Sequence, residues 1–222
     1  LEEMVSLAER LDGPAVGEAV ARLAEWSREG PVPDELLRRL DDAVGAATPA
    51  EPDRYAVRVE LDVLLGRPVD VEEVRRVLDR EIDGFLPDIA AEFDTVGIRD
   101  VVQAASAVDR LIRAGRPVEA YEALAEAIPP GVEPPAQIVG RLGWAALEAG
   151  RPEEAAEALE GISRSAHRTI VKLRLGRAYE ALGRRDEALE AYRTFLSRTE
   201  PANEGLGAVA LAREAVARLG GP

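Results

Sequence analysis

The chain has 222 residues, of which 46% are hydrophobic and 4% aromatic, and its formal net charge is −14 at pH 7. The apolar fraction is sufficient for a continuous buried core, whereas the acidic balance argues against nucleic acid as a partner because phosphate binding depends on Lys and Arg. The absence of cysteine excludes disulfides and thiolate chemistry. No apolar run approaches the roughly 18 residues of a membrane span, so we expect no membrane partner and a cytoplasmic location.

The charged residues are unevenly distributed along the chain. Every basic residue except Lys172 is an arginine, which fits a high-GC genome and leads us to expect a bacterial source. Most of the negative charge lies in residues 1–100, whereas residues 161–200 are mildly basic. The chain therefore combines an acidic front with a weakly basic region nearer its end.

Apolar residues recur at helical spacing along the whole chain, and no stretch shows the sustained alternation that is typical of strands. Proline and glycine divide this pattern into segments of roughly 10 to 18 residues, the length of ordinary globular helices. The sequence therefore predicts an all-α protein with about a dozen helices.

Residues 1–97 are predicted to form acidic, degenerate helical hairpins. The segments that begin at Gly30-Pro31 and at Gly66-Arg67-Pro68 look like the same interhelical turn. Near residues 84–97 glycine, proline and phenylalanine interrupt the helical spacing. We therefore expect an irregular joint there, between these hairpins and the second half of the chain.

One short pattern occurs three times in the second half, as Ala114-Gly115-Arg116-Pro117-Val118-Glu119-Ala120, Ala149-Gly150-Arg151-Pro152-Glu153-Glu154-Ala155 and Leu182-Gly183-Arg184-Arg185-Asp186-Glu187-Ala188. The glycines stand 35 and 33 residues apart, and self-similarity at this period indicates stacked helical hairpins. Glycine is common just past a helix C-terminus, and acidic residues favour a helix start. We therefore predict that each glycine ends the first helix of a pair.

The clearest predicted pair runs from about Thr169 to Leu182 and from about Arg185 to Leu196. A closing helix is predicted within residues 202–222, from about Asn203 to Leu219. The pair resembles the tetratricopeptide repeat (TPR) family, with matches at Leu175, Gly176, Tyr179, Gly183, Ala188, Tyr192, Phe195 and Pro201. Two preceding units place similar residues at the same positions, so a divergent resemblance covers about residues 98–201 as three repeats.

The resemblance implies a right-handed α-solenoid of antiparallel helix hairpins. In such an array small residues let neighbouring helices approach closely, while larger apolar residues fill the remaining gaps. The small residues at the matching positions are Ala120, Gly143, Ala155, Gly176 and Ala188.

The sequence contains no recognisable catalytic constellation. His167 is the only histidine, and without cysteine or a spaced carboxylate partner it fits a solvated or capping role better than catalysis or metal binding. No Gly-x-Ser-x-Gly hydrolase motif and no Gly-x-x-x-x-Gly-Lys phosphate loop is present. Adjacent acidic pairs such as Glu153-Glu154 are explained by solvated helix starts. We therefore expect no enzyme activity, no cofactor and no metal.

The remaining type of site is a groove. The resemblance implies that the first helix of each repeat lines a concave face that binds partner segments. Carried onto this chain, that face comprises Asp109, Ile112, Arg141, Trp144, Glu148, Leu173, Arg174, Arg177 and Glu180. Asp109, Trp144 and Arg177 stand where chaperone-binding members carry the asparagine of a carboxylate clamp, so recognition of chaperone tails is not implied.

Trp144 has two interpretations. Large aromatic side chains dominate binding hot spots, which favours a direct role in the groove. A buried tryptophan that packs against a neighbouring helix is the alternative, and the closing helix could also fill the groove.

The sequence thus indicates a noncatalytic scaffold or adaptor that binds a protein or peptide segment which is partly apolar and carries acidic groups. Two alternatives remain open at this point. The chain could be a regulatory or sensor module of a larger bacterial transcription or signalling protein. It could also be a self-assembling architectural protein, a homo-oligomer in which the acidic front of one copy meets the basic region of another.

Overall fold

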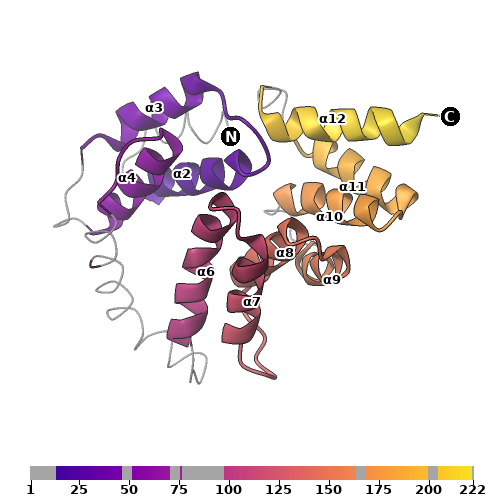
Figure 1. The fold of residues 1–222 in the computed structure, drawn as a ribbon. Coiled ribbons are helices and arrows are strands. Elements are labelled where there is room, and N and C mark those ends of the chain that lie inside the picture. The colour runs from indigo at the N-terminus through magenta and orange to yellow at the C-terminus, as the bar shows by residue number, and fades with distance from the viewer. Residues whose placement is uncertain are drawn as a thin grey trace. The chain divides into compact units, whose positions relative to one another are not determined.

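The computed structural model describes residues 14–46, 52–70, 76, 98–163, 169–199 and 205–221. In these ranges the secondary structure is α-helix without any strand, as the sequence predicted (Figure 1). The described residues form ten helices rather than about a dozen: α2 (Pro14–Ser27), α3 (Asp34–Val44), α4 (Pro52–Leu64), α6 (Ile98–Arg113), α7 (Pro117–Ala127), α8 (Ala136–Glu148), α9 (Pro152–Ile162), α10 (Thr169–Ala181), α11 (Arg185–Ser197) and α12 (Gly207–Gly220). The predicted joint at 84–97 and His167 lie outside the described residues.

The chain divides into two compact units. The first comprises Leu1–Phe85 and Thr199–Glu214, and the second comprises Leu86–Arg198 and Ala215–Pro222. The first unit therefore contains α2, α3, α4 and the N-terminal half of α12. The second contains α6 to α11 and the C-terminal end of α12.

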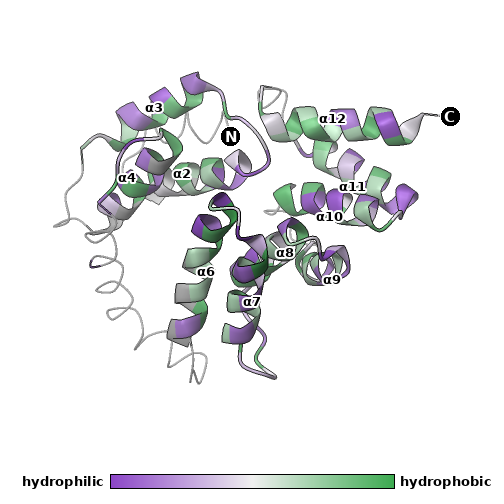
Figure 2. Cartoon of the chain, in the orientation of Figure 1, coloured by the Kyte–Doolittle hydropathy of each residue, from purple (hydrophilic) through white to green (hydrophobic). Residues whose placement is uncertain are grey.

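In the first unit α2 packs against both α3 and α4. The helix α3 shows why: Leu36, Leu40 and Val44 recur every four residues and are buried, while charged residues occupy the opposite face. Figure 2 shows this amphipathic pattern as green and purple sides of the same helix. The helix α2 contributes the matching apolar side chains Ala19, Val20, Leu23 and Ala24.

The second unit is a row of antiparallel helix pairs. The pairs α6 and α7, α8 and α9, and α10 and α11 each pack together, and α7 packs on α8 as α9 packs on α10. Each hairpin therefore contacts its neighbours along the chain, which is the arrangement of an α-solenoid. The first helices α6, α8 and α10 also contact one another in sequence.

The turn inside each of these pairs has one repeated geometry. Gly115, Gly150 and Gly183 follow the first helix with φ of 73°, 71° and 71°. In each turn the next arginine donates its backbone N–H to the carbonyl five residues earlier, as Arg116 does to Leu111 at 2.8 Å. The prediction that these glycines end the first helices is confirmed.

The two turns that the sequence compared in residues 1–97 prove to be different. After α4, Gly66 has φ of 67° and Arg67 N–H bonds to the Asp62 carbonyl at 2.8 Å, as in the repeat turns. Gly30 has φ of 151°, and the residue after it, Pro31, has no N–H to donate such a bond. A Cβ on Gly30 would lie 2.8 Å from backbone atoms of Gly207, so this glycine permits a close backbone approach instead of closing a helix.

Close packing inside the helix pairs depends on small residues, as predicted. A Cβ on Gly143 would lie 2.6 Å from Leu159, and one on Gly176 would lie 2.7 Å from the Tyr192 ring. Both distances are too short for a real contact, so α8 approaches α9 and α10 approaches α11 only because these positions lack a side chain. The alanines that the sequence singled out are completely buried: Ala120, Ala155 and Ala188.

The closing helix α12 begins at Gly207, four residues after the predicted start at Asn203. Gly205 and Leu206 form a turn, and the backbone N–H of Gly207 bonds to the Pro31 carbonyl at 2.8 Å. That bond satisfies one of the amides that a helix start leaves without an internal partner. At the other end Arg185 donates to the carbonyls of Leu219 and Gly221 at 2.7 and 2.6 Å, which caps the negative end of the helix dipole.

Candidate functional site

The residues proposed from the sequence come from three helices that touch in series. Asp109 and Ile112 lie on α6, and α8 packs on α6 and on α10. The other members are Arg141, Trp144 and Glu148 on α8, and Leu173, Arg174, Arg177 and Glu180 on α10. The fold therefore brings the nine residues onto one row of first helices within the second unit.

Trp144 and its neighbours form the interior of this row. Trp144 is 3% exposed and belongs to a buried cluster with Val101, Ala105 and Val108 of α6. The Arg174 guanidinium lies over its indole ring, 5.5 Å from the centroid, which is a cation–π geometry.

Arg174 is 2% exposed and Leu173 is completely buried. Together with Trp144 these side chains offer almost no surface to a partner. Their position matches the packing interpretation of Trp144, in which the indole joins α8 to its neighbours.

Two arginines of the row connect each first helix to the preceding one. Arg141 on α8 donates from Nη1 to the Ala105 carbonyl of α6 at 2.8 Å. Arg177 on α10 donates from Nη2 to Glu148 Oε1 of α8 at 2.9 Å. The Arg177 and Glu148 side chains are each 28% exposed, so this ion pair lies at the solvent boundary.

Glu180 receives a contact of the same kind from α12. Arg218 forms an ion pair with Glu180, and the Tyr192 hydroxyl donates to Glu180 Oε2 at 3.0 Å. The hydrogen bond from Arg218 is the main cause that lowers the pKa of Glu180. Arg218 was not among the residues that the sequence pattern of the groove predicts. Its place on the predicted closing helix was the available signal.

A second row of arginines runs through the turns, and the sequence pattern of the groove does not include it. Arg151 lies 4.8 Å from the Tyr121 ring centroid and pairs with Glu122 at 3.4 Å, both on the preceding second helix. Arg184 lies 4.4 Å from the ring centroid of Tyr179 and pairs with Glu160 of α9 at 3.7 Å. Burial, followed by the hydrogen bond to Glu160, raises the pKa of Tyr179 to about 12.

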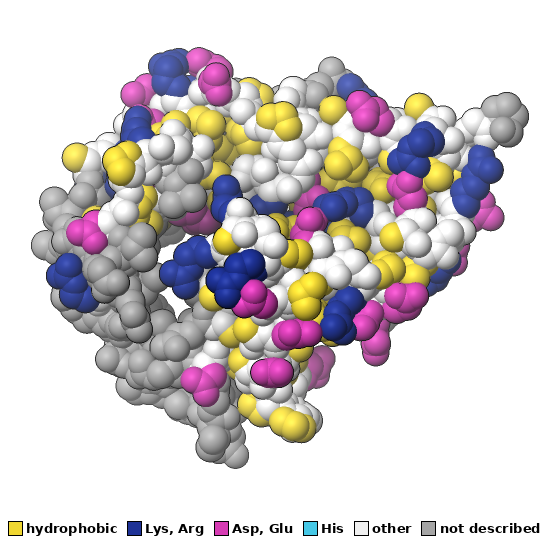
Figure 3. Space-filling model, in the orientation of Figure 1, with side chains coloured by type: hydrophobic (Ala, Val, Ile, Leu, Met, Phe, Trp, Pro, Cys, Tyr) yellow, Lys and Arg dark blue, Asp and Glu magenta, His cyan; other side chains and the backbone are white. Residues whose placement is uncertain are grey.

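The turn arginines also pair within their own helices. Arg116, Arg151 and Arg184 each form an ion pair with the glutamate three residues later, namely Glu119, Glu154 and Glu187. On the face shown in Figure 3 the acidic and basic side chains of the second unit are interspersed rather than gathered into separate patches. The repeated signal was visible in the sequence as Arg-x-x-Glu after each repeat glycine.

The partly exposed members of the first-helix row carry groups that can donate or accept hydrogen bonds. Asp109, Ile112, Arg141, Glu148, Arg177 and Glu180 are neither fully buried nor fully exposed. They present carboxylates, guanidinium groups and one apolar side chain. Among the described residues no group of three or more His, Cys, Asp or Glu side chains is placed to hold a metal ion.

The class of protein follows from the fold and from one match to a known family. The fold and the row of first helices define a helical-repeat protein, built from hairpins whose geometry recurs with the sequence period. Residues 146–200 match the family model described as tetratricopeptide repeat, so the predicted resemblance is confirmed over α9, α10 and α11. No curated protein and no solved structure matches the chain.

Tetratricopeptide repeats are in general noncatalytic modules for protein–protein interaction. The matched segment includes two of the three predicted repeat turns, those at Gly150 and Gly183. No helix among the described residues is both long and apolar enough to cross a lipid bilayer.

Proposed function

We propose that this protein is a noncatalytic scaffold or adaptor that binds a segment of a partner protein across α6, α8 and α10. The observation that carries the proposal is the row of half-exposed charged side chains on three adjacent first helices, in a chain with a tetratricopeptide repeat match. Trp144, Leu173 and Arg174 support this surface from below, because they are buried and fix the spacing of the helices.

The proposed partner segment is partly apolar and carries acidic groups. Arg177 and Arg141 supply guanidinium donors at the edge of the row, and a carboxylate of the partner can replace Glu148 as acceptor for Arg177. Ile112 supplies apolar contact on α6. The proposal includes a bacterial source, which the arginine-rich composition supports, and a cytoplasmic location.

The test is affinity capture with matched charge reversals. Partners captured from the source organism by the wild type are identified by mass spectrometry, and each is then titrated against purified variants. Arg177→Glu is expected to weaken binding by roughly tenfold, because it removes a donor and places like charges together. Arg184→Glu is the control, since Arg184 is also paired and partly exposed but lies in the turn between α10 and α11.

A partner that tolerates Arg177→Glu, or that loses affinity equally with both variants, would contradict the proposed face. Trp144→Ala is unsuitable as a binding variant. Removal of its buried indole is expected to cost about 3–5 kcal/mol of stability, so a loss of binding would not separate contact from unfolding.

A further inference from the structure

The second helices of the three pairs are α7, α9 and α11. On α7 and α9 one face meets the turn of the next repeat, whereas on α11 no other described helix covers the matching stripe of residues in that way. The stripe follows the spacing i, i+3, i+4, i+7, i+8 and i+11 of one helix face. It lines a shallow hollow of about 450 Å³ in the second unit, formed by Asp186, Leu189, Glu190, Arg193, Thr194 and Ser197.

The equivalent face of α7 is occupied by the next repeat turn. Counted from the repeat glycines, Leu189 and Glu190 take the positions of Tyr121 and Glu122. Tyr121 packs against the buried cluster that joins α8, α9 and α10. Arg151 of the following turn lies over its ring and pairs with Glu122.

The equivalent face of α9 also meets the next repeat turn, but the ion pair forms three residues later on the helix. Ala156 takes the position of Leu189 and is buried against Ala178 of α10. Glu160 takes the position of Arg193 and pairs with Arg184 of the next turn. Both earlier second helices therefore receive an arginine from the turn that starts the following second helix.

Among the described residues, no arginine of a following repeat turn contacts the equivalent face of α11. The helix α12 packs where a following first helix would lie, because Arg218 contacts Glu180. A Cβ on Gly220 would lie 3.8 Å from Arg193 Nη2 and 3.9 Å from Leu189 Cδ2, so the C-terminal end of α12 borders one edge of the stripe. Glu190 is exposed, and the described part of the chain gives it neither a hydrogen bond nor an ion pair. The stripe thus holds a half-buried leucine and a carboxylate at the two positions that α7 uses to receive a second helix.

We propose that this stripe docks an α-helix of a partner protein whose first turn reads Arg-x-x-Glu. The three second helices of this chain all open in that way, and in each the arginine and glutamate are paired. The arginine of the docked helix pairs with Glu190, its glutamate pairs with Arg193, and a small apolar side chain rests on Leu189. The charges of the stripe are complementary to this order.

The probe is a synthetic peptide of residues 149–163 of this chain, which contains one such turn and helix. It is titrated into the isotope-labelled full chain and followed by NMR. Chemical-shift changes are expected at the stripe residues of α11. Glu190→Arg in the protein is expected to weaken binding of the wild-type peptide about two- to fivefold, the range of exposed ion pairs. A peptide that carries Arg151→Glu is expected to restore binding to the Glu190→Arg protein, because the two charges are exchanged.

The control variant is Glu157→Arg, which reverses an exposed glutamate at the matching position of α9. Because a free helix of this length is marginally stable, the same residues are also grafted behind Leu219, where tethering raises the effective concentration. The graft is expected to raise the melting temperature, and Glu190→Arg is expected to remove most of that gain.

Three results would overturn the proposal. Shift changes confined to α6, α8 and α10 would assign the peptide to the first-helix face instead. A graft that leaves the melting temperature unchanged, or that responds equally to Glu190→Arg and Glu157→Arg, would show that the stripe does not receive such a helix. A wild-type dimer that Glu190→Arg dissociates would make a second copy the occupant.

Discussion

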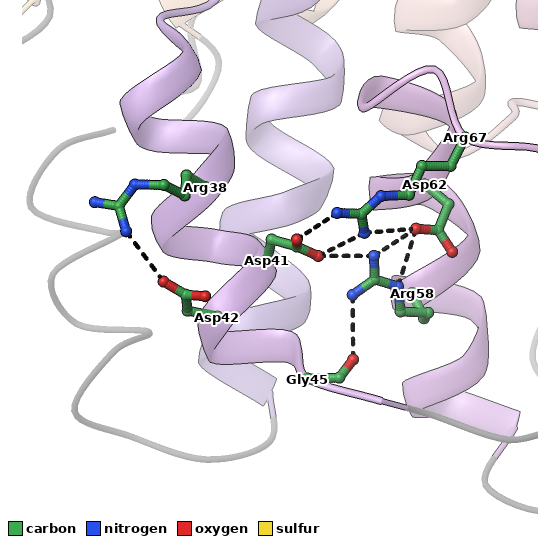
Figure 4. Close-up of polar contacts among 7 residues, drawn as sticks. All are labelled: Arg38, Asp41, Asp42, Gly45, Arg58, Asp62 and Arg67. Carbon is green, nitrogen blue, oxygen red and sulfur yellow. Dashed lines mark hydrogen bonds and ion pairs between the residues drawn. The ribbon is translucent and has the colours of Figure 1, made fainter.

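At the residue scale, Asp41 shows how the first unit stabilises ionised groups near its surface (Figure 4). Arg58 of α4 approaches its carboxylate at 2.7 Å, and Arg67 in the turn after α4 donates to it at 2.8 Å. Both arginines also pair with Asp62. The hydrogen bond from Arg67 is the largest cause that lowers the pKa of Asp41 to about 2.

This network predicts acid sensitivity of the first unit. The folded pKa of Asp41 lies below the value of roughly 3.9 in an unfolded chain, so its stabilising contribution is present above that value and is lost as the pH falls from about 4 to about 2. Asp41→Asn should therefore lower stability at neutral pH and reduce the further loss between pH 4 and pH 2. Denaturant unfolding of the wild type and of Asp41→Asn at neutral pH, at pH 4 and at pH 2 measures these free energies.

Asp42 provides the matched control for this prediction. It neighbours Asp41 on α3, but its side chain is 72% exposed and pairs only with the exposed Arg38 among the interactions drawn in Figure 4. Asp42→Asn is expected to change stability little, because exposed ion pairs contribute little. Equal effects of the two substitutions on stability would show that the pairing of Asp41 with Arg58 and Arg67 contributes no more than an exposed ion pair.

At the element scale, each helix pair depends on small residues at its crossing. Ala155 on α9 and Ala188 on α11 are completely buried. Ala155→Leu and Ala188→Leu are each expected to destabilise the protein by about 1–3 kcal/mol, because a larger side chain must enter a close contact. The exposed Ala123 on α7 supplies the control, and unchanged denaturant midpoints in both test variants would refute the packing assignment.

The start of α12 gives a second prediction at this scale. A Cβ on Gly207 would lie 2.3 Å from the Pro31 side chain, whereas one on Gly161 in α9 would meet no atom within 4 Å. Gly207→Ala is therefore expected to cost about 1–3 kcal/mol. Gly161→Ala is expected to be neutral or to stabilise by up to about 1 kcal/mol, since it reduces backbone freedom. The free energy of unfolding of both variants, measured in guanidinium chloride, tests whether Gly207→Ala loses stability and Gly161→Ala does not.

At the scale of the whole molecule, the stability of a repeat unit is expected to vary along the row. The helix α10 packs on α8, α9 and α11, and seven of its residues are buried. By contrast α7 buries Ala120 and Leu124. In repeat arrays the stability of an element follows its interfaces with neighbours, so α10 should open less readily than α7.

Hydrogen exchange followed by mass spectrometry tests this gradient. Backbone amides of α10 are expected to exchange more slowly than those of α7 under native conditions, because local opening costs more where more apolar contacts are broken. Equal protection of the two helices would indicate that the second unit opens only as a whole. The gradient would then be absent.

The sequence alone determined the features that local chemistry controls. The turn glycines, the arginine and acidic residues that follow them, and the small residues at helix crossings all repeat at one period, so Gly115, Gly150 and Gly183 could be placed at helix ends without a structure. The bounds of α10 and α11 were predicted to within a residue for the same reason.

Features that depend on contacts between distant residues required the tertiary structure. Gly30 resembles a turn glycine in sequence, but its role comes from the approach of Gly207, far along the chain. Trp144 occupies a groove position of the repeat, and only the packing of α6 beside α8 buries it.

The arginines show the same division most clearly. The sequence gives their number and spacing, and its repeats give the turn positions of Arg116, Arg151 and Arg184. Which carboxylate, ring or carbonyl each guanidinium meets depends on the neighbouring hairpin. Periodicity is a local property of the chain, whereas burial and ion pairing arise only when the hairpins stack. The sequence therefore determined the repeat, and the tertiary structure decided which of its side chains are buried and which stay exposed.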